Sequence, residues 1–168
     1  VSRHGVGYDA VDVGALNARK SPLCIVGDVN SVSVAEHAMM LILASVKRLI
    51  RSDRSVRQGP WGWRNKLEQG ELAGKTLLIL GYGRIGRHLA RMAAAFGMTI
   101  LAHDPWALAH GWPDGPAQPV ATLAEGLALA DVVSVNLPKA DRPILGAAEL
   151  ALVKPGAVIV NTARGGIV

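Results

Sequence analysis

An apolar run that ends in three regularly spaced glycines constrains this chain more than any other feature. Residues 77–80 read Leu-Leu-Ile-Leu, and the sequence then continues through Gly81, Gly83 and Gly86 into a helix-like stretch. Strand, glycine turn and helix form the setting in which G-x-G-x-x-G indicates a dinucleotide site. Gly81 lets the chain turn off the strand, Gly83 lets a pyrophosphate approach the backbone, and Gly86 lets the helix pack closely on the strand. The pyrophosphate would sit on the free N–H groups of the helix N-terminus.

A second signal lies at the end of the next expected strand. Residues 98–103 are mostly apolar and lead into Asp104, roughly 20 residues beyond the glycine turn. An acid at this spacing receives the ribose hydroxyls of the adenosine half and repels a 2′-phosphate, which favours NAD over NADP. The alternative interpretation is that Asp104 only caps its strand and turns the chain into Pro105.

The remaining chain alternates between apolar runs and helical stretches. We expect strands over 76–80, 98–103, 131–137 and 157–161, helices over 84–96, 122–130 and 147–152, and a loop over 107–119. Nearly continuous apolar strands that are separated by helices imply a parallel sheet covered on both faces. The predicted fold class is therefore α/β, with a doubly wound parallel sheet of the Rossmann type that is truncated at its end.

The chain divides into two unequal parts. Residues 1–32 are too few to hold a core of their own, and we interpret them as the end of a second, substrate-binding domain. Residues 33–168 form the dinucleotide-binding domain, incomplete at its C-terminus. Ser33 and Glu36 have the spacing of a capping box, so we expect one long interdomain helix over 33–57. The chain starts without a signal-peptide pattern or an initiator methionine, so we expect that it does not begin at a natural start.

Composition excludes several other classes of protein. The 168 residues are 50% hydrophobic, and no apolar run is long enough to span a membrane. The net charge is +5, and the basic residues over 47–57 fit a solvated helix face better than a nucleic-acid site. Cys24 is the single cysteine, so no intrachain disulfide can form, which is compatible with the cytoplasm. No metal site is predicted.

The last expected strand places an arginine at the ligand-binding rim. Thr162, Ala163 and Arg164 follow that strand, as Leu137 and Pro138 follow the strand before it. In a doubly wound sheet, ligands bind beyond the carboxyl ends of the strands. A guanidinium there can clamp a carboxylate or a carbonyl, because it is planar and always charged. An ordinary surface arginine is an equally open interpretation.

Several motifs in a fixed order carry a family resemblance. They are HGVGYDAVD at 4–12, NSVSVAEH at 30–37, LAGK at 72–75, GYGRIG at 81–86, FGM at 96–98, HDP at 103–105 and NTARGG at 161–166. Together they resemble the D-isomer-specific 2-hydroxyacid dehydrogenases, which include phosphoglycerate, glycerate, D-lactate and formate dehydrogenases. The resemblance covers the whole chain and implies NAD-dependent hydride transfer with a small D-2-hydroxy acid or 2-oxo acid.

The resemblance also implies roles for individual residues. Cofactor-binding positions are Gly81, Gly83, Arg84, Ile85 and Gly86 at the pyrophosphate, Asp104 at the adenosine ribose, Leu137 and Pro138 at the adenine side, and Thr162 and Ala163 near the nicotinamide. Arg164 matches the catalytic arginine, which orients the 2-oxo acid and polarises its carbonyl. Val6 and Asn30 match positions beside the substrate or nicotinamide in some members of the family.

One part of the family pattern has no counterpart here. Members are about twice as long, and a glutamate and a histidine follow the arginine motif; that histidine is the general acid that protonates the carbonyl. The histidines of this chain lie at positions 4, 37, 88, 103 and 110, and none takes that role. We therefore expect catalysis from the full-length protein and none from residues 1–168 alone.

A second class of function stays open at this point. An NAD-sensing dimeric scaffold, similar to the transcriptional corepressors that share this fold, would use the cofactor to stabilise a dimer. Trp61 and Trp63 either pack on the long helix or form a subunit interface. We expect a homodimer through the nucleotide-binding domain, and the Ala, Gly and Arg content favours a bacterial enzyme.

Overall fold

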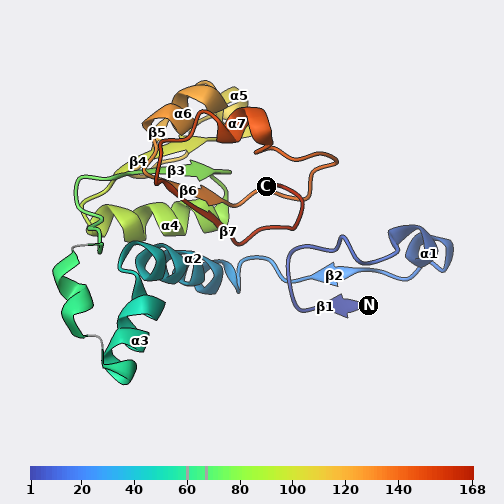
Figure 1. The fold of residues 1–168 in the computed structure, drawn as a ribbon. Coiled ribbons are helices and arrows are strands. Elements are labelled where there is room, and N and C mark those ends of the chain that lie inside the picture. Colours follow the sequence, from blue (N-terminus) through green and yellow to red (C-terminus); the bar gives the residue numbers. More distant parts are fainter. Residues whose placement is uncertain (60, 67) are drawn as a thin grey trace.

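A five-stranded parallel sheet forms the centre of the molecule (Figure 1). The computed structural model describes residues 1–59, 61–66 and 68–168. The strands are β3 (Thr76–Leu80), β4 (Thr99–His103), β5 (Gln118–Pro119), β6 (Val132–Val135) and β7 (Val158–Asn161). Their order in the sheet is β5-β4-β3-β6-β7. The chain runs outward from β3 to β5 and then returns to the other side of β3, so the topological switch point lies between β3 and β6. The predicted doubly wound parallel sheet is confirmed.

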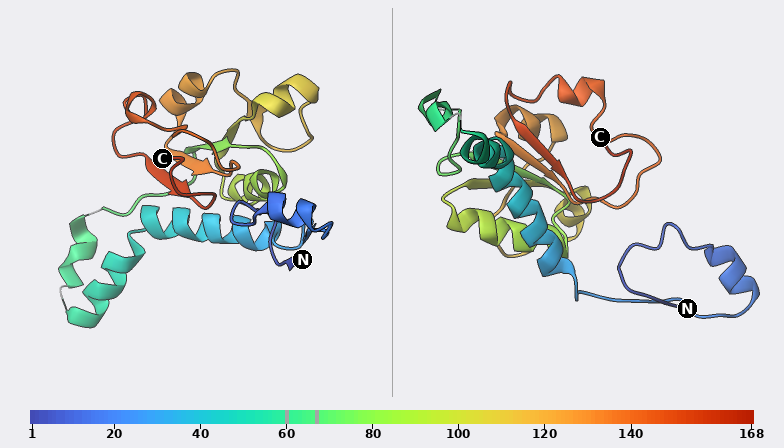
Figure 2. Two further views of the ribbon diagram at one scale, coloured as in Figure 1. Left: turned by 90° about the vertical axis from the view of Figure 1, so that its right-hand side faces the viewer. Right: turned by 60° about the horizontal axis from the view of Figure 1, so that its bottom comes forward.

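Helices cover both faces of this sheet (Figures 1 and 2). On one face lie α2 (Ser31–Val46) and α4 (Arg84–Ala95), and on the other lie α5 (Pro105–His110), α6 (Leu123–Leu129) and α7 (Ala147–Leu150). Alternate residues of β3 point to opposite faces. Leu77 and Ile79 belong to the core with α2 and α4, whereas Leu78 and Leu80 belong to the core with α6. Because β3 is buried on both faces, its sequence is a continuous apolar run.

The stretch 107–119 contains more structure than the predicted loop. Helix α5 begins at Pro105, and the Asp104 side chain caps it by accepting a 3.0 Å hydrogen bond from the Ala107 N–H. Proline at the first helical position is favourable because its missing N–H has no partner to lose. The short β5 adds an edge to the sheet through Gln118 opposite Leu101. Its proline is tolerated because an edge strand leaves one side unpaired.

The predicted long helix over 33–57 is wrong as a single element. The structure has α2, which starts at Ser31, and a separate α3 (Leu49–Gln58), with Arg48 between them at φ 53°. Packing explains the break, because α2 lies on α4 and β7, while α3 is mostly exposed and projects from the sheet (Figure 1). The predicted capping box is also absent, since Asn30 is the N-cap and makes no side-chain cap bond.

The two tryptophans after α3 have different surroundings. Both belong to the 3₁₀ helix η1 (Trp61–Lys66). Trp63 is 8% exposed and has the Arg51 guanidinium 5.1 Å from its ring centroid. Trp61 is 58% exposed, and the Arg64 guanidinium lies 5.6 Å from its ring centroid. Packing on the helix therefore accounts for Trp63, and Trp61 stays a surface residue.

The first thirty residues form an extension with little core (Figure 2). They contain β1 (Ser2–Arg3), α1 (Val13–Ala18) and β2 (Cys24–Ile25), and the two strands pair in parallel. Asp12 caps α1 by accepting a 2.8 Å hydrogen bond from the Ala15 N–H. No residue of β1, α1 or β2 is buried. Across the described part of the chain, no helix has the length and apolar character that crossing a membrane needs.

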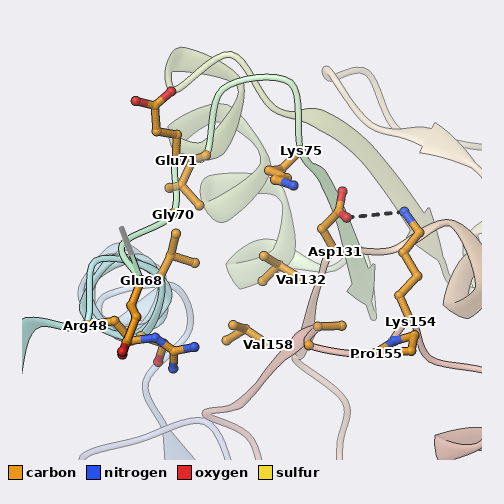
Figure 3. Close-up of a pocket in the computed structure, with 15 residues that line it drawn as sticks. Arg48, Glu68, Gly70, Glu71, Lys75, Asp131, Val132, Lys154, Pro155 and Val158 are labelled. Atoms are coloured by element: carbon orange, nitrogen blue, oxygen red, sulfur yellow. Dashed lines mark hydrogen bonds and ion pairs between the residues drawn. The ribbon is translucent and has the colours of Figure 1, made fainter. Parts of the chain in front are cut away.

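Asp131 and its partners join the amino ends of the strands, at the end of the sheet opposite the glycine turn (Figure 3). Asp131, just before β6, accepts a 2.9 Å hydrogen bond from the Thr76 N–H at the start of β3. Its other oxygen lies 3.3 Å from the Lys154 ammonium, which precedes β7. Burial alone would raise the pKa of Asp131, but the Thr76 and Lys154 hydrogen bonds outweigh it, so the pKa lies below its ordinary value. Asp131 therefore joins the starts of three strands as a charged group.

Replacing this carboxylate should weaken the fold in a pH-dependent way. We expect Asp131→Asn to lower the free energy of unfolding by about 1–2 kcal/mol at pH 7. Because the folded pKa of Asp131 lies below the unfolded one, its stabilisation is complete above about pH 4 and is lost as the pH falls through the folded pKa. Urea unfolding at neutral and acid pH measures both effects. The control is Asp53→Asn, because Asp53 pairs with Arg57 on an exposed helix face and its loss should change stability by less than about 0.5 kcal/mol. Equal losses in the two variants at pH 7 would contradict this role of Asp131.

Candidate active site

The glycine turn joins β3 to α4 at the carboxyl edge of the sheet. Gly81 has φ 90°, and a methyl group added there would lie 2.9 Å from the Asn136 carbonyl oxygen. A methyl group at Gly86 would overlap the Gly81 carbonyl oxygen, whereas one at Gly83 would meet nothing within 4 Å. The first and third glycines are therefore required by protein packing. The second faces open space where a ligand can approach the backbone.

The N-terminus of α4 is open to that same space. Gly83 is the N-cap residue, and no side chain caps the helix. The first N–H groups of a helix lack partners within the helix and carry its positive dipole end. Arg84 and Ile85 begin the helix. Their backbone thus offers the donor set and the charge that a pyrophosphate requires.

Asp104 closes the turn from the neighbouring strand. One of its carboxylate oxygens accepts a 2.8 Å hydrogen bond from the Tyr82 N–H, and the other accepts the Ala107 N–H that caps α5. The sequence left open that Asp104 only caps its strand and turns the chain into Pro105; in the structure its side chain instead caps helix α5, which starts at Pro105. These two hydrogen bonds leave acceptor capacity on the carboxylate, because each oxygen has a second lone pair for a hydroxyl donor. Asp104 both fixes the glycine turn and keeps acceptor capacity beside it.

A cavity of about 440 Å³ lies beyond the ends of β6 and β7. It brings together residues from the turn after β6, the turn after β7, α4 and the N-terminal extension. The predicted site residues that line it are Val6, Asn30, Ile85, Leu137, Pro138, Thr162, Ala163 and Arg164. The other predicted residues, Gly81, Gly83, Arg84, Gly86 and Asp104, belong to the glycine turn and its clamp.

Three polar atoms in this cavity wall are buried without a partner among the described residues. They are Asn30 Oδ1, Asn136 Oδ1 and Thr162 Oγ1. Burying a polar atom without a hydrogen bond is unfavourable, so such atoms in a native protein need an explanation. Hydroxyl and amide donors of a bound dinucleotide would satisfy them. Together with the open space at Gly83, these atoms fit a dinucleotide in this cavity.

Arg164 is held by neighbours that the sequence analysis did not assign. Its Nε donates a 2.7 Å hydrogen bond to the Asp9 carboxylate, and an Nη donates a 2.9 Å bond to the Ala163 carbonyl. Its other Nη lies where a side chain on Gly7 would have to be. The Arg164 hydrogen bond holds the pKa of Asp9 below its ordinary value. Gly7 and Asp9 lie within the HGVGYDAVD motif, which was the one signal that could have pointed to them.

Two further side chains are placed in ways the sequence did not indicate. The Arg84 guanidinium donates a 3.0 Å hydrogen bond to the Gly27 carbonyl in the N-terminal extension. His37, on α2, lines a second cavity of about 610 Å³ together with Asn161 and Arg164. Arg164 therefore lines two cavities. One is shared with the N-terminal extension, and the other is shared with α2.

Several known proteins are similar to this chain in sequence and in structure. The family model described as D-isomer specific 2-hydroxyacid dehydrogenase, NAD binding domain, matches residues 39–168. The D-3-phosphoglycerate dehydrogenase of Mycobacterium tuberculosis is 40% identical over 173 residues, which cover 100% of this chain and 32% of the relative. That of Methanocaldococcus jannaschii is 35% identical with the same coverage.

Solved structures give the same result. The NAD-dependent formate dehydrogenase from Staphylococcus aureus, in complex with NAD, matches with a TM-score of 0.86 and 30% identity over 99% of this chain and 50% of that one. The D-lactate dehydrogenase from Aquifex aeolicus, complexed with NAD and lactic acid, matches with a TM-score of 0.84 and 30% identity, again over 99% and 50%. The chain thus spans about a third of the curated relatives and half of these solved chains. It belongs to the D-isomer specific 2-hydroxyacid dehydrogenase family, and residues 39–168 are an NAD-binding domain of that family.

Proposed function

We propose that the full-length protein is an NAD-dependent oxidoreductase that transfers hydride between NAD and a small D-2-hydroxy acid or its 2-oxo acid. The observation that carries this proposal is the position of Arg164. Its guanidinium lines the same cavity as Thr162 and Ala163, next to the open N-terminus of α4. A fixed positive charge beside a dinucleotide site can bind the acid's carboxylate and stabilise the negative charge that develops on its carbonyl oxygen.

The chain's own residues then have separate tasks. The backbone of the turn from Gly81 to Gly86 would hold the pyrophosphate, with Arg84 and Ile85 at the helix start. Asp104 would accept from the adenosine ribose, and Leu137 and Pro138 would cover the adenine side. Thr162 and Ala163 would lie near the nicotinamide, and Val6 and Asn30 beside the substrate. NAD supplies the hydride acceptor or donor, and Arg164 orients the acid toward it.

The two parts of the chain have different roles in this proposal. Residues 33–168 are the NAD-binding domain, and residues 1–32 belong to the substrate-binding domain. The exposure of β1, α1 and β2 supports this division. The extension meets the site through the hydrogen bonds of Arg84 with Gly27 and Arg164 with Asp9. Substrate would bind where the two parts meet.

We also propose a bacterial, cytoplasmic homodimer that assembles through the NAD-binding domain. The support for the dimer is an apolar cavity of about 690 Å³ between α2 and α4, lined by Met40, Leu43, Met92 and Phe96 among others. Met40 and Phe96 are 48% and 45% exposed. Mycobacterial relatives support a bacterial source, and a chain whose single cysteine cannot pair within it suits the cytoplasm. The relatives named above carry enzyme names and lend no support to the scaffold alternative.

Arg164 provides the direct test of the enzymatic proposal. Arg164→Ala in the full-length protein should lower kcat for 2-oxo acid reduction by about 100- to 1000-fold, because it removes charge stabilisation of the developing alkoxide. NADH oxidation over a panel of small 2-oxo acids measures this. Arg64→Ala is the control, since Arg64 stacks on Trp61 away from the cavity. Near-normal turnover by Arg164→Ala would refute the assignment.

Gly83 and Gly86 form a matched pair that separates cofactor binding from packing. Gly83→Ala should leave stability nearly unchanged, because its methyl group enters open space, yet weaken NAD binding about tenfold or more by occupying the ligand's approach. Gly86→Ala should lower the free energy of unfolding by about 1–3 kcal/mol through its overlap with the Gly81 carbonyl. Calorimetric NAD titration and urea unfolding of both variants measure these effects. If Gly83→Ala bound NAD like the wild type, the proposed path of the pyrophosphate would be wrong.

The dimer surface has its own test. Met40→Glu would place a charge in the apolar cavity between α2 and α4, and burying an unpaired charge is strongly unfavourable. We expect the dimer dissociation constant to rise at least about 100-fold, as measured by sedimentation velocity. Leu129→Glu is the control, because Leu129 is similarly exposed, at 49%, on α6 across the sheet. An unchanged dimer in the Met40 variant would exclude this surface.

A further inference from the structure

The guanidinium of Arg164 is held on three of its nitrogens. Nε donates to the Asp9 carboxylate at 2.7 Å, one Nη donates to the Ala163 carbonyl at 2.9 Å, and the other Nη lies against Gly7. We propose that Asp9 is a positioning residue that aims Arg164 at the carboxylate of the 2-oxo acid, and that Gly7 leaves the space in which the guanidinium is held. This inference rests on the proposed function, because it concerns the orientation of the Arg164 guanidinium toward the substrate.

An unrestrained arginine would be a poor clamp. Its long side chain has several rotatable bonds, and fixing them against a substrate costs conformational entropy. The Ala163 carbonyl, from the neighbouring residue in the sequence, holds one Nη at the far end of the side chain. Asp9 approaches from the opposite end of the chain and fixes Nε, which sets the plane of the guanidinium. The restraint is in place before a ligand binds.

The charge of Asp9 suits this role. The Arg164 hydrogen bond, with a smaller contribution from the nearby Lys139, keeps the pKa of Asp9 below its ordinary value, so the carboxylate is ionised at neutral pH. Charge-assisted hydrogen bonds of this kind are shorter and stronger than neutral ones. Asp9 does not cancel the positive field, since Lys139 lines the same cavity as Arg164. A small carboxylate ligand is therefore still attracted.

Gly7 restrains the guanidinium from the other side. A methyl group at this position would overlap an Nη and the central carbon of the Arg164 side chain. Those atoms are the far end of a flexible side chain, so Gly7→Ala should displace the guanidinium without disrupting the fold. Two independent changes thus move the Arg164 guanidinium. Asp9→Ala removes its hydrogen-bond partner, and Gly7→Ala displaces it by steric overlap.

The contact also makes the site depend on how the chain's two parts meet. Asp9 and Gly7 belong to the N-terminal extension, and Arg164 follows β7 of the sheet. The arginine reaches its restrained position only when the extension lies on the NAD-binding domain. Substrate binding and the meeting of the two parts would then be coupled through one ion pair.

The kinetic test uses the full-length protein with NADH and the best 2-oxo acid substrate. We expect Asp9→Ala and Gly7→Ala to lower kcat/KM by about 10- to 100-fold, the size of effect that a misplaced binding group produces, with an unchanged Kd for NADH. Asp9→Asn should lie in between, because its amide oxygen still accepts from Nε. The matched control is Asp12→Ala, which removes the cap of α1 in the same extension and should change kcat/KM by less than about twofold. Equal effects of Asp9→Ala and Asp12→Ala would overturn the proposal.

A second readout is independent of turnover. In the wild type, the Nε–H proton of Arg164 should give a slowly exchanging NMR signal, and oxalate, an inert mimic of a 2-oxo acid, should bind the NADH complex. Asp9→Ala should lose the signal and bind oxalate about tenfold more weakly. If the wild type reduced no 2-oxo acid while these two changes were seen, the proposed function would fail and the positioning role would hold. If the wild type were active and neither change appeared, the positioning role alone would fail.

Discussion

The close approach of α4 to the end of β3 is the constraint on which the rest of the site depends. It exists because Gly86 has no side chain where the Gly81 carbonyl passes. The approach sets the N-terminus of α4 directly at the switch point of the sheet. Asp104 then holds the turn by accepting from the Tyr82 N–H. Without this geometry the first N–H groups of the helix would not face the space at Gly83, and no dinucleotide site would form there.

The sheet and its main helices could be predicted because their signals are local. Strand β3 is buried on both faces and therefore reads as an unbroken apolar run, and Thr122 starts α6 by accepting a hydrogen bond from the Glu125 N–H three residues later. The break after α2 could not be predicted in this way. Apolar periodicity continues past it, and the left-handed conformation of Arg48 has no sequence signal. Strand β5 was missed because two residues pair with β4 only through tertiary packing.

In the candidate site, too, features with a local sequence signal could be predicted, whereas contacts formed only on folding could not. Arg164 could be placed at the rim because ligands bind beyond the carboxyl ends of the strands, a rule that needs only the position at which the strand ends. Its partner could not be found in this way, because Asp9 lies at the other end of the chain and the two meet only in the folded structure. The need for glycine at position 7 could not be predicted either. In a sequence, a glycine indicates conformational freedom of the backbone, but Gly7 is required because the Arg164 guanidinium occupies the space of a side chain there.

Two arginines of the NAD-binding part, Arg84 and Arg164, both reach the N-terminal extension. Arg84 donates to the Gly27 carbonyl and Arg164 to the Asp9 carboxylate. Arg84 lies at the start of α4, where we propose that the pyrophosphate binds, and Arg164 follows β7, where we propose that the acid binds. The surface proposed to bind ligands is thus also the surface that receives the extension. Any ligand that draws either guanidinium toward itself must alter a contact between the two parts, so ligand binding and the docking of the extension share the same charged groups.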